Sequence, residues 1–116
     1  MENEAEPIIR AMKAERNIVF CGKRILTGRL FGQKVGIVVC GVGKVNAACG
    51  TQIAVDELGA EEIINVGVAG GLNSTLEVGG IYEISHAVQY DFDLTQLNGT
   101  THPFFCITKS TSAGGE

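Results

Sequence analysis

The stretch from Ile63 to Leu72, Ile-Ile-Asn-Val-Gly-Val-Ala-Gly-Gly-Leu, constrains the fold of this 116-residue chain more than any other. Its first half is a short apolar run, which is typical of a parallel strand buried on both faces. Its second half contains Gly67, Gly70 and Gly71. Backbone without side chains can turn tightly and can approach a ligand closely. Ligands of open α/β sheets bind beyond the carboxyl ends of the strands. The stretch therefore predicts either a central strand that delivers backbone to a small-molecule site or simply a tight turn.

A second glycine turn, Gly41-Val42-Gly43-Lys44, follows an apolar segment at 35–39 and precedes a helix expected from Lys44 to Leu58. Segment 35–39 is predicted to be another central strand. The order strand, glycine turn, helix is found at nucleotide sites, but two phosphate-binding patterns fail here. Val45 follows Lys44 where the Walker pattern requires Ser or Thr, and Asn46 stands where the dinucleotide fingerprint requires a third glycine. What remains is a glycine turn at a helix N-terminus, which can hold an anion or admit the edge of a ligand.

Spacing also predicts the other elements of the chain. A helix is expected from Met1 to about Glu15, with Pro7 in its first turn. A tight hairpin is expected at Gly32-Gln33, between segments 24–31 and 34–40. A further strand is expected from Val78 to about Val88. Together these elements predict an α/β domain with a mixed, twisted sheet and flanking helices.

Composition excludes several classes of protein. The chain has 45% apolar residues and a formal net charge of −4, and its Lys and Arg residues form no basic stripe. These features argue against binding to nucleic acid or to an acidic membrane. Its apolar runs are too short to span a bilayer, and its first residues do not resemble a signal peptide, so a cytoplasmic protein is expected. The cysteines lack metal-ligand spacing and are expected to be reduced, buried thiols; they are Cys21, Cys40, Cys49 and Cys106.

Four segments in register resemble one known family. They are Met1–Glu4, Cys40–Ala48, Ile64–Leu72 and Val78–Ile81. Their order and spacing are similar to those of the nucleoside phosphorylase superfamily, and most similar to its 5′-methylthioadenosine/S-adenosylhomocysteine nucleosidases. The resemblance extends to about Thr95 and covers only the N-terminal half of such proteins. It implies a nucleoside phosphorylase-like fold that is apparently truncated, with residues 1–116 forming one partial domain.

The resemblance also implies an activity and a set of site residues. Family members of this kind hydrolyse the N-glycosidic bond of purine nucleosides such as 5′-methylthioadenosine or S-adenosylhomocysteine, with no metal or other cofactor. They act as homodimers, and Leu97 corresponds loosely to the loop that reaches the neighbouring subunit's site. The residue that matches the general base is Glu4. The positions that match the lining of the substrate site are Val42 beside the 5′-alkylthio group, and Val68, Ala69 and Gly70 beside ribose and base.

Departures from the family pattern leave alternatives open. Val68 stands where many nucleosidases have Ser, and the acid that protonates the leaving purine falls in the part of the family beyond this chain. One alternative is a phosphate-dependent purine nucleoside phosphorylase, for which Arg24 and Arg29 are candidate phosphate ligands by residue type alone. Another is a non-catalytic truncated fragment that binds adenine nucleosides or dimerises. A flavodoxin-like binding module fits the strand–helix rhythm but leaves the four motifs unexplained.

Overall fold

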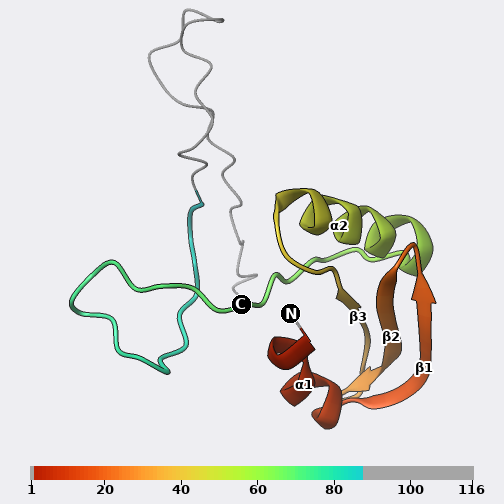
Figure 1. The fold of residues 1–116 in the computed structure, drawn as a ribbon. Coiled ribbons are helices and arrows are strands. Elements are labelled where there is room, and N and C mark those ends of the chain that lie inside the picture. Colours follow the sequence, from red (N-terminus) through yellow and green to blue (C-terminus); the bar gives the residue numbers. More distant parts are fainter. Residues whose placement is uncertain (1, 88–116) are drawn as a thin grey trace, which may run out of the picture. The chain divides into compact units, whose positions relative to one another are not determined.

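The structure is a computed structural model that describes residues 2–87 (Figure 1). Five elements follow one another along the chain: α1 (Glu2–Ala11), β1 (Lys13–Phe20), β2 (Lys23–Leu30), β3 (Gln33–Val39) and α2 (Lys44–Leu58). All five belong to the first of two compact units, Met1–Gly70. The fold is α/β, with a small twisted sheet and helices beside it, as the sequence predicts.

The sheet is an antiparallel meander in the order β1-β2-β3. Each of its two turns has two consecutive residues with positive φ: Cys21 and Gly22 at 49° and 72°, and Phe31 and Gly32 at 51° and 82°. Two such residues are characteristic of the type I′ turn, whose twist matches that of the strands it joins. The hairpin expected at Gly32 is therefore confirmed, and its turn begins at Phe31, one position earlier than expected.

The turn at Phe31 provides a direct test of backbone strain. A non-glycine residue in the left-handed region is strained by its own Cβ, and Asn tolerates this region far better than Phe. The Phe31 side chain is 93% exposed, so little apolar burial is lost when it is replaced. We expect Phe31→Asn to raise the free energy of unfolding by about 1 kcal/mol, as measured by urea denaturation. The exposed neighbour Gln33→Asn, on the strand side of the turn, is the control, and an equal gain there would contradict the strain argument.

A β-bulge distorts the pairing of β1 with β2. The register passes from Ala14↔Gly28 to Arg16↔Thr27, which leaves Glu15 as the extra residue. A Cβ at Gly28 would overlap the carbonyl oxygen of Lys13 and would lie 2.9 Å from the Cα of Ala14. The backbones of the two strands can approach this closely only because residue 28 has no side chain.

Helix α2 packs on one face of the sheet, at β3. A Cβ at Gly50 of α2 would meet Cys40 Cβ at 2.5 Å and Val38 Cγ1 at 3.6 Å, so glycine allows this close approach. Ile25, which is paired with Val38 in the sheet, is 1% exposed. Leu26 points to the opposite face and is 2% exposed, so both faces of β2 are covered. Helix α1 contacts β1 and β3.

The predicted strands after α2 are not formed. Ile63–Leu72 has no strand assignment, residues 61–70 are all exposed, and residues 78–87 also form no strand. A parallel strand exists only when its N–H and C=O groups are paired with those of a neighbouring strand, and no such pairing is present for this segment among the described residues. Strand β3 is consequently at the edge of the described sheet, whereas the sequence predicted a central position for it. The described sheet is antiparallel throughout.

Three smaller expectations are also corrected. Helix α1 ends at Ala11 and the charged segment from Lys13 already belongs to β1, although helical spacing predicted a helix to Glu15. Pro7 lies inside α1, beyond its first turn. The described cysteines are free as expected, but Cys21 and Cys49 are exposed and not buried. Cys21 is in a turn, and Cys49 precedes Gly50, the residue of α2 that faces the sheet.

Candidate functional site

The structure brings Glu4 to the glycine-rich segment that follows α2. Glu4 lies in the first half of α1, and its Oε1 accepts a hydrogen bond of 3.0 Å from the backbone N–H of Val68, 64 residues later in the sequence. A Cβ at Gly67 would lie 3.7 Å from the same oxygen, so the absence of a side chain there leaves this oxygen accessible. A carboxylate and the exposed backbone of residues 67–70 therefore lie together, with Ala69 and Gly70 continuing the segment.

The surroundings of Glu4 favour its ionised form. The positively charged amino terminus and then the hydrogen bond from Val68 lower the pKa of Glu4 below 4.5, while partial desolvation opposes them. A lowered folded-state pKa stabilises the fold above pH 4.5, and this contribution is lost as the pH falls through the folded-state pKa. At neutral pH the group is a carboxylate, which is the form that accepts a proton.

Val42 lies in the other glycine turn, between β3 and α2. It is 73% exposed, and it is flanked by Gly41 and Gly43 with φ of 91° and 96°. Gly43 is the N-cap of α2 and provides no side-chain cap. The backbone N–H groups at this helix start are therefore not capped by the side chain that usually serves there.

A buried lysine that the sequence analysis did not identify supports this turn. Lys23 is 7% exposed, and its Nζ donates to the carbonyl oxygen of Cys40 at 2.7 Å and to Oδ1 of Asn46 at 2.9 Å. The Nδ2 of Asn46 in turn donates to the carbonyl oxygen of Val42 at 2.7 Å. The only sequence signal was Asn46 itself, a polar residue that occupies a glycine position of the failed dinucleotide pattern.

The two candidate phosphate ligands are engaged within the hairpins. Arg24 Nε donates to Asn17 Oδ1 at 3.4 Å, across the β1–β2 pair. Arg29 Nη1 donates to the Gly32 carbonyl oxygen at 3.1 Å, and its Nε lies 3.9 Å from Glu15 Oε1. These contacts give both guanidinium groups a structural role in the meander.

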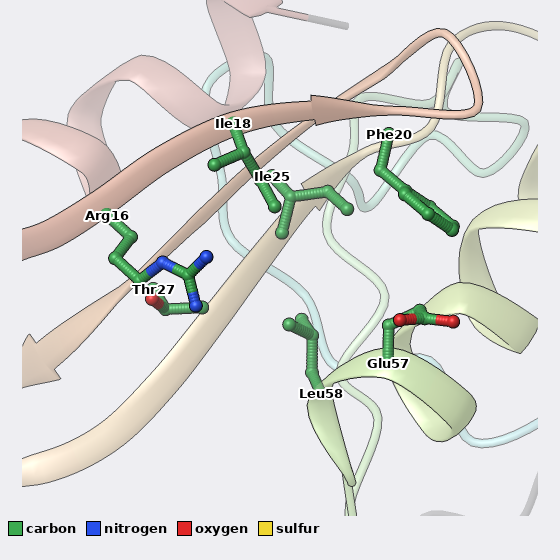
Figure 2. Close-up of a pocket in the computed structure, with 7 residues that line it drawn as sticks. All are labelled: Arg16, Ile18, Phe20, Ile25, Thr27, Glu57 and Leu58. Carbon is green, nitrogen blue, oxygen red and sulfur yellow. The ribbon is translucent and has the colours of Figure 1, made fainter.

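A hollow of about 150 Å³ lies on the α2 face of the sheet, where strand side chains face Leu58 (Figure 2). None of the predicted site residues lines it, so it is separate from the candidate site. Its lining consists of Arg16, Ile18, Phe20, Ile25, Thr27, Glu57 and Leu58.

Some expectations concern absences or lie outside the described residues. Leu97 and Cys106 are beyond residue 87. Within residues 2–87 the structure contains no group of three or more His, Cys, Asp or Glu side chains placed to hold a metal ion. In the same range, no helix combines the length and apolarity needed to cross a bilayer.

Among the proteins that are similar to this chain are two relatives and one solved structure. The chain is 36% identical over 100 residues to a 5′-methylthioadenosine/S-adenosylhomocysteine nucleosidase of Listeria monocytogenes, covering 86% of this chain and 43% of the relative. It is 45% identical over 69 residues to the nucleosidase of the same name from Desulfotalea psychrophila, covering 60% and 30%. The crystal structure of the Neisseria meningitidis nucleosidase in complex with methylthio-immucillin-A superposes with a TM-score of 0.79 at 32% identity, covering 84% of this chain and 42% of that one.

The chain thus spans less than half the length of these relatives. The model of the phosphorylase superfamily matches residues 1–113, which is nearly the whole chain. The similarity in structure, which covers 84% of this chain, agrees with this match. The chain belongs to the phosphorylase superfamily.

Proposed function

We propose that this chain carries the N-terminal part of a site that cleaves the N-glycosidic bond of 5′-methylthioadenosine or S-adenosylhomocysteine by hydrolysis. The observation that supports this most directly is the 3.0 Å contact between Glu4 Oε1 and the N–H of Val68. It joins the residue that matches the family's general base to the segment that matches the ribose and base lining. The similar proteins named as nucleosidases support the same activity.

In the proposed reaction Glu4 is the general base. A water oxygen forms a bond to the anomeric carbon of the ribose, and the proton that this water loses passes to the Glu4 carboxylate. The bond between that carbon and the purine nitrogen breaks, and the purine leaves with the electron pair. Because the pKa of Glu4 is lowered, the carboxylate is already ionised when substrate binds at neutral pH. We assign protonation of the leaving purine to an acid in the part of the relatives that the match to this chain does not cover.

The other site residues are proposed as substrate contacts. Val68, Ala69 and Gly70 would line ribose and base, where residues 67–70 are exposed and close to Glu4. Val42 would contact the 5′-alkylthio group with its exposed side chain. A homodimer in the cytoplasm and a role in methionine salvage follow from the same family assignment and are part of this proposal.

Phosphorolysis is the second candidate, and the structure offers it less support. Arg24 and Arg29 were its only candidate anion ligands, by residue type alone, and each has a contact within the hairpins instead of with the candidate site. A fragment that binds adenine nucleosides without cleaving them is the third candidate, since the chain spans less than half of its relatives.

The test is adenine release from 5′-methylthioadenosine by the 116-residue chain, with and without phosphate. Binding of methylthio-immucillin-A is measured in parallel by calorimetry. Release without phosphate supports the proposal, and release that requires phosphate replaces it with phosphorolysis. Binding without release supports the non-catalytic fragment. If the chain neither binds the inhibitor nor releases adenine, the proposal of a substrate site in this chain is contradicted.

A further inference from the structure

The hydrogen bonds around Lys23 form a connected path to the glycine turn before α2. Lysine is rarely buried unless its charge is paired or hydrogen-bonded, and Lys23 at 7% exposure is satisfied by a carbonyl and an amide oxygen. Because the cation requires acceptors, Asn46 must present Oδ1 to Lys23 and therefore presents Nδ2 to the carbonyl oxygen of Val42. The lysine thus fixes the orientation of the asparagine amide.

The two side chains hold the turn from both sides of Gly41. Lys23 binds the carbonyl of Cys40, which precedes this glycine, and Asn46 binds the carbonyl of Val42, which follows it. With φ of 91° and 96° at its two glycines, the turn has no regular backbone pairing of its own to define it. The side chain of Asn46 also lies 3.6 Å from where a Cβ at Gly41 would stand, so it packs against the turn as well.

Nothing in the main-chain fold requires a cation at this position. Lys34, on the adjacent strand β3, is exposed, as is usual for lysine. The residue paired with Lys23 in β1 is Phe20, which is not charged. A buried ammonium is costly to desolvate unless its hydrogen bonds are specific, and the hydrogen bonds of Lys23 Nζ within residues 2–87 go to the carbonyl oxygen of Cys40 and to Asn46. The hydrogen bonds of the Lys23 ammonium therefore stabilise the backbone conformation at Val42, and they do not join the strands of the sheet.

We propose that Lys23 and Asn46 are positioning residues that fix Val42 and thereby set the preference of the site for the 5′ substituent of the nucleoside. The inference rests on the proposed function, because that function places Val42 beside the 5′-alkylthio group. The 73% exposed side chain of Val42 is then held at a defined place, and an alkylthio group gains an apolar contact that a 5′-hydroxyl does not.

Two variants separate the steps of this path. Lys23→Met removes both hydrogen bonds of the ammonium while keeping a side chain of similar length. Asn46→Asp keeps an acceptor for Lys23 but removes the donor to the Val42 carbonyl oxygen. Because Asn46 is exposed, this variant is expected to fold even if Lys23→Met does not. Lys34→Met makes the same chemical change at an exposed lysine of β3 and is the matched control.

The measured quantity is the ratio of kcat/KM for 5′-methylthioadenosine to kcat/KM for adenosine, which lacks the alkylthio group. We expect this ratio to fall about tenfold in Lys23→Met and in Asn46→Asp and to stay unchanged in Lys34→Met, because the lost apolar contact concerns only the alkylthio substrate. A purely structural role of the two residues would lower both rates equally and leave the ratio unchanged.

The outcomes distinguish this inference from the proposed function on which it rests. If the unmodified chain cleaves neither nucleoside, the proposed function fails and the inference fails with it. If the unmodified chain cleaves 5′-methylthioadenosine but Asn46→Asp keeps its preference, the proposed function stands and the inference is overturned. A reduced ratio in Asn46→Asp with an unchanged ratio in Lys34→Met supports the whole path.

Discussion

Replacement of Glu4 by Gln is expected to reduce hydrolysis of 5′-methylthioadenosine by at least about a hundredfold, because an amide cannot take the proton from the attacking water. The fold is expected to remain intact, since the Gln side chain keeps an oxygen that can accept the hydrogen bond from Val68. The measurement is adenine release under conditions in which the unmodified protein is active, together with a far-ultraviolet circular dichroism spectrum of the variant.

Glu6→Gln is the matched control for this prediction. Glu6 is two residues further along the same helix, and its contact is an exposed ion pair with Arg10 at 3.3 Å, which contributes little to stability. Its replacement is expected to leave hydrolysis unchanged. If Glu4→Gln retained near-normal turnover while folded, Glu4 would not be the general base.

Gly28→Ala is expected to lower the free energy of unfolding by about 3 kcal/mol, at the upper end of the range for overpacked sites. The new Cβ would meet three backbone atoms of Lys13 and Ala14, and backbone at a paired bulge cannot move aside without breaking the β1–β2 register. Urea denaturation of the variant measures the loss.

Gly36→Ala is the comparison for this second prediction. Gly36 is also a strand glycine, but the nearest atom to its added Cβ is Cδ1 of Leu58 at 2.7 Å, the far end of a flexible side chain. We expect a loss of only about 1 kcal/mol there, since Leu58 can change rotamer. Equal losses in the two variants would show that the bulge is not rigid and would contradict the argument.

The local elements of the fold were predictable from the sequence because their signals are local. The Gly32-Gln33 pair between two strand-like segments predicted the hairpin, although the turn itself is Phe31-Gly32, and the sequence also predicted that helix α2 ends at Leu58. Gly59 has φ of 62° and its N–H donates to the Ala54 carbonyl, as expected of a helix C-cap. These conformations depend on a few neighbouring residues, so tertiary context does not override them.

The prediction of a strand at Ile63–Leu72 was wrong. An apolar run specifies a buried strand only when the chain also supplies its neighbours and its covering layers, and residues 61–70 are all exposed here. The start of β1 was missed for the opposite reason. Lys13–Arg16 has no apolar alternation, and its strand conformation is imposed by pairing with Thr27, Gly28 and Arg29.

The candidate site was predictable in part. Resemblance to the family identified Glu4 and Val68, and the structure places them in contact, while their roles remain predictions. The Lys23–Asn46 pair was not predicted, because the two residues are 23 positions apart and no spacing rule relates a strand lysine to a helix asparagine. Such a pair becomes visible only when the burial of the lysine is known.

The contact between Glu4 and Val68 has a consequence for the order in which the molecule assembles. Strand pairing closes only short loops, as with Lys13 and Arg29, whereas this contact spans 64 residues. Short loops close faster and at a lower entropic cost, so the meander can form while the chain is still being synthesised. The proposed catalytic group must wait until residue 68 has left the ribosome. Its geometry is therefore completed after the meander, on a sheet that has already formed.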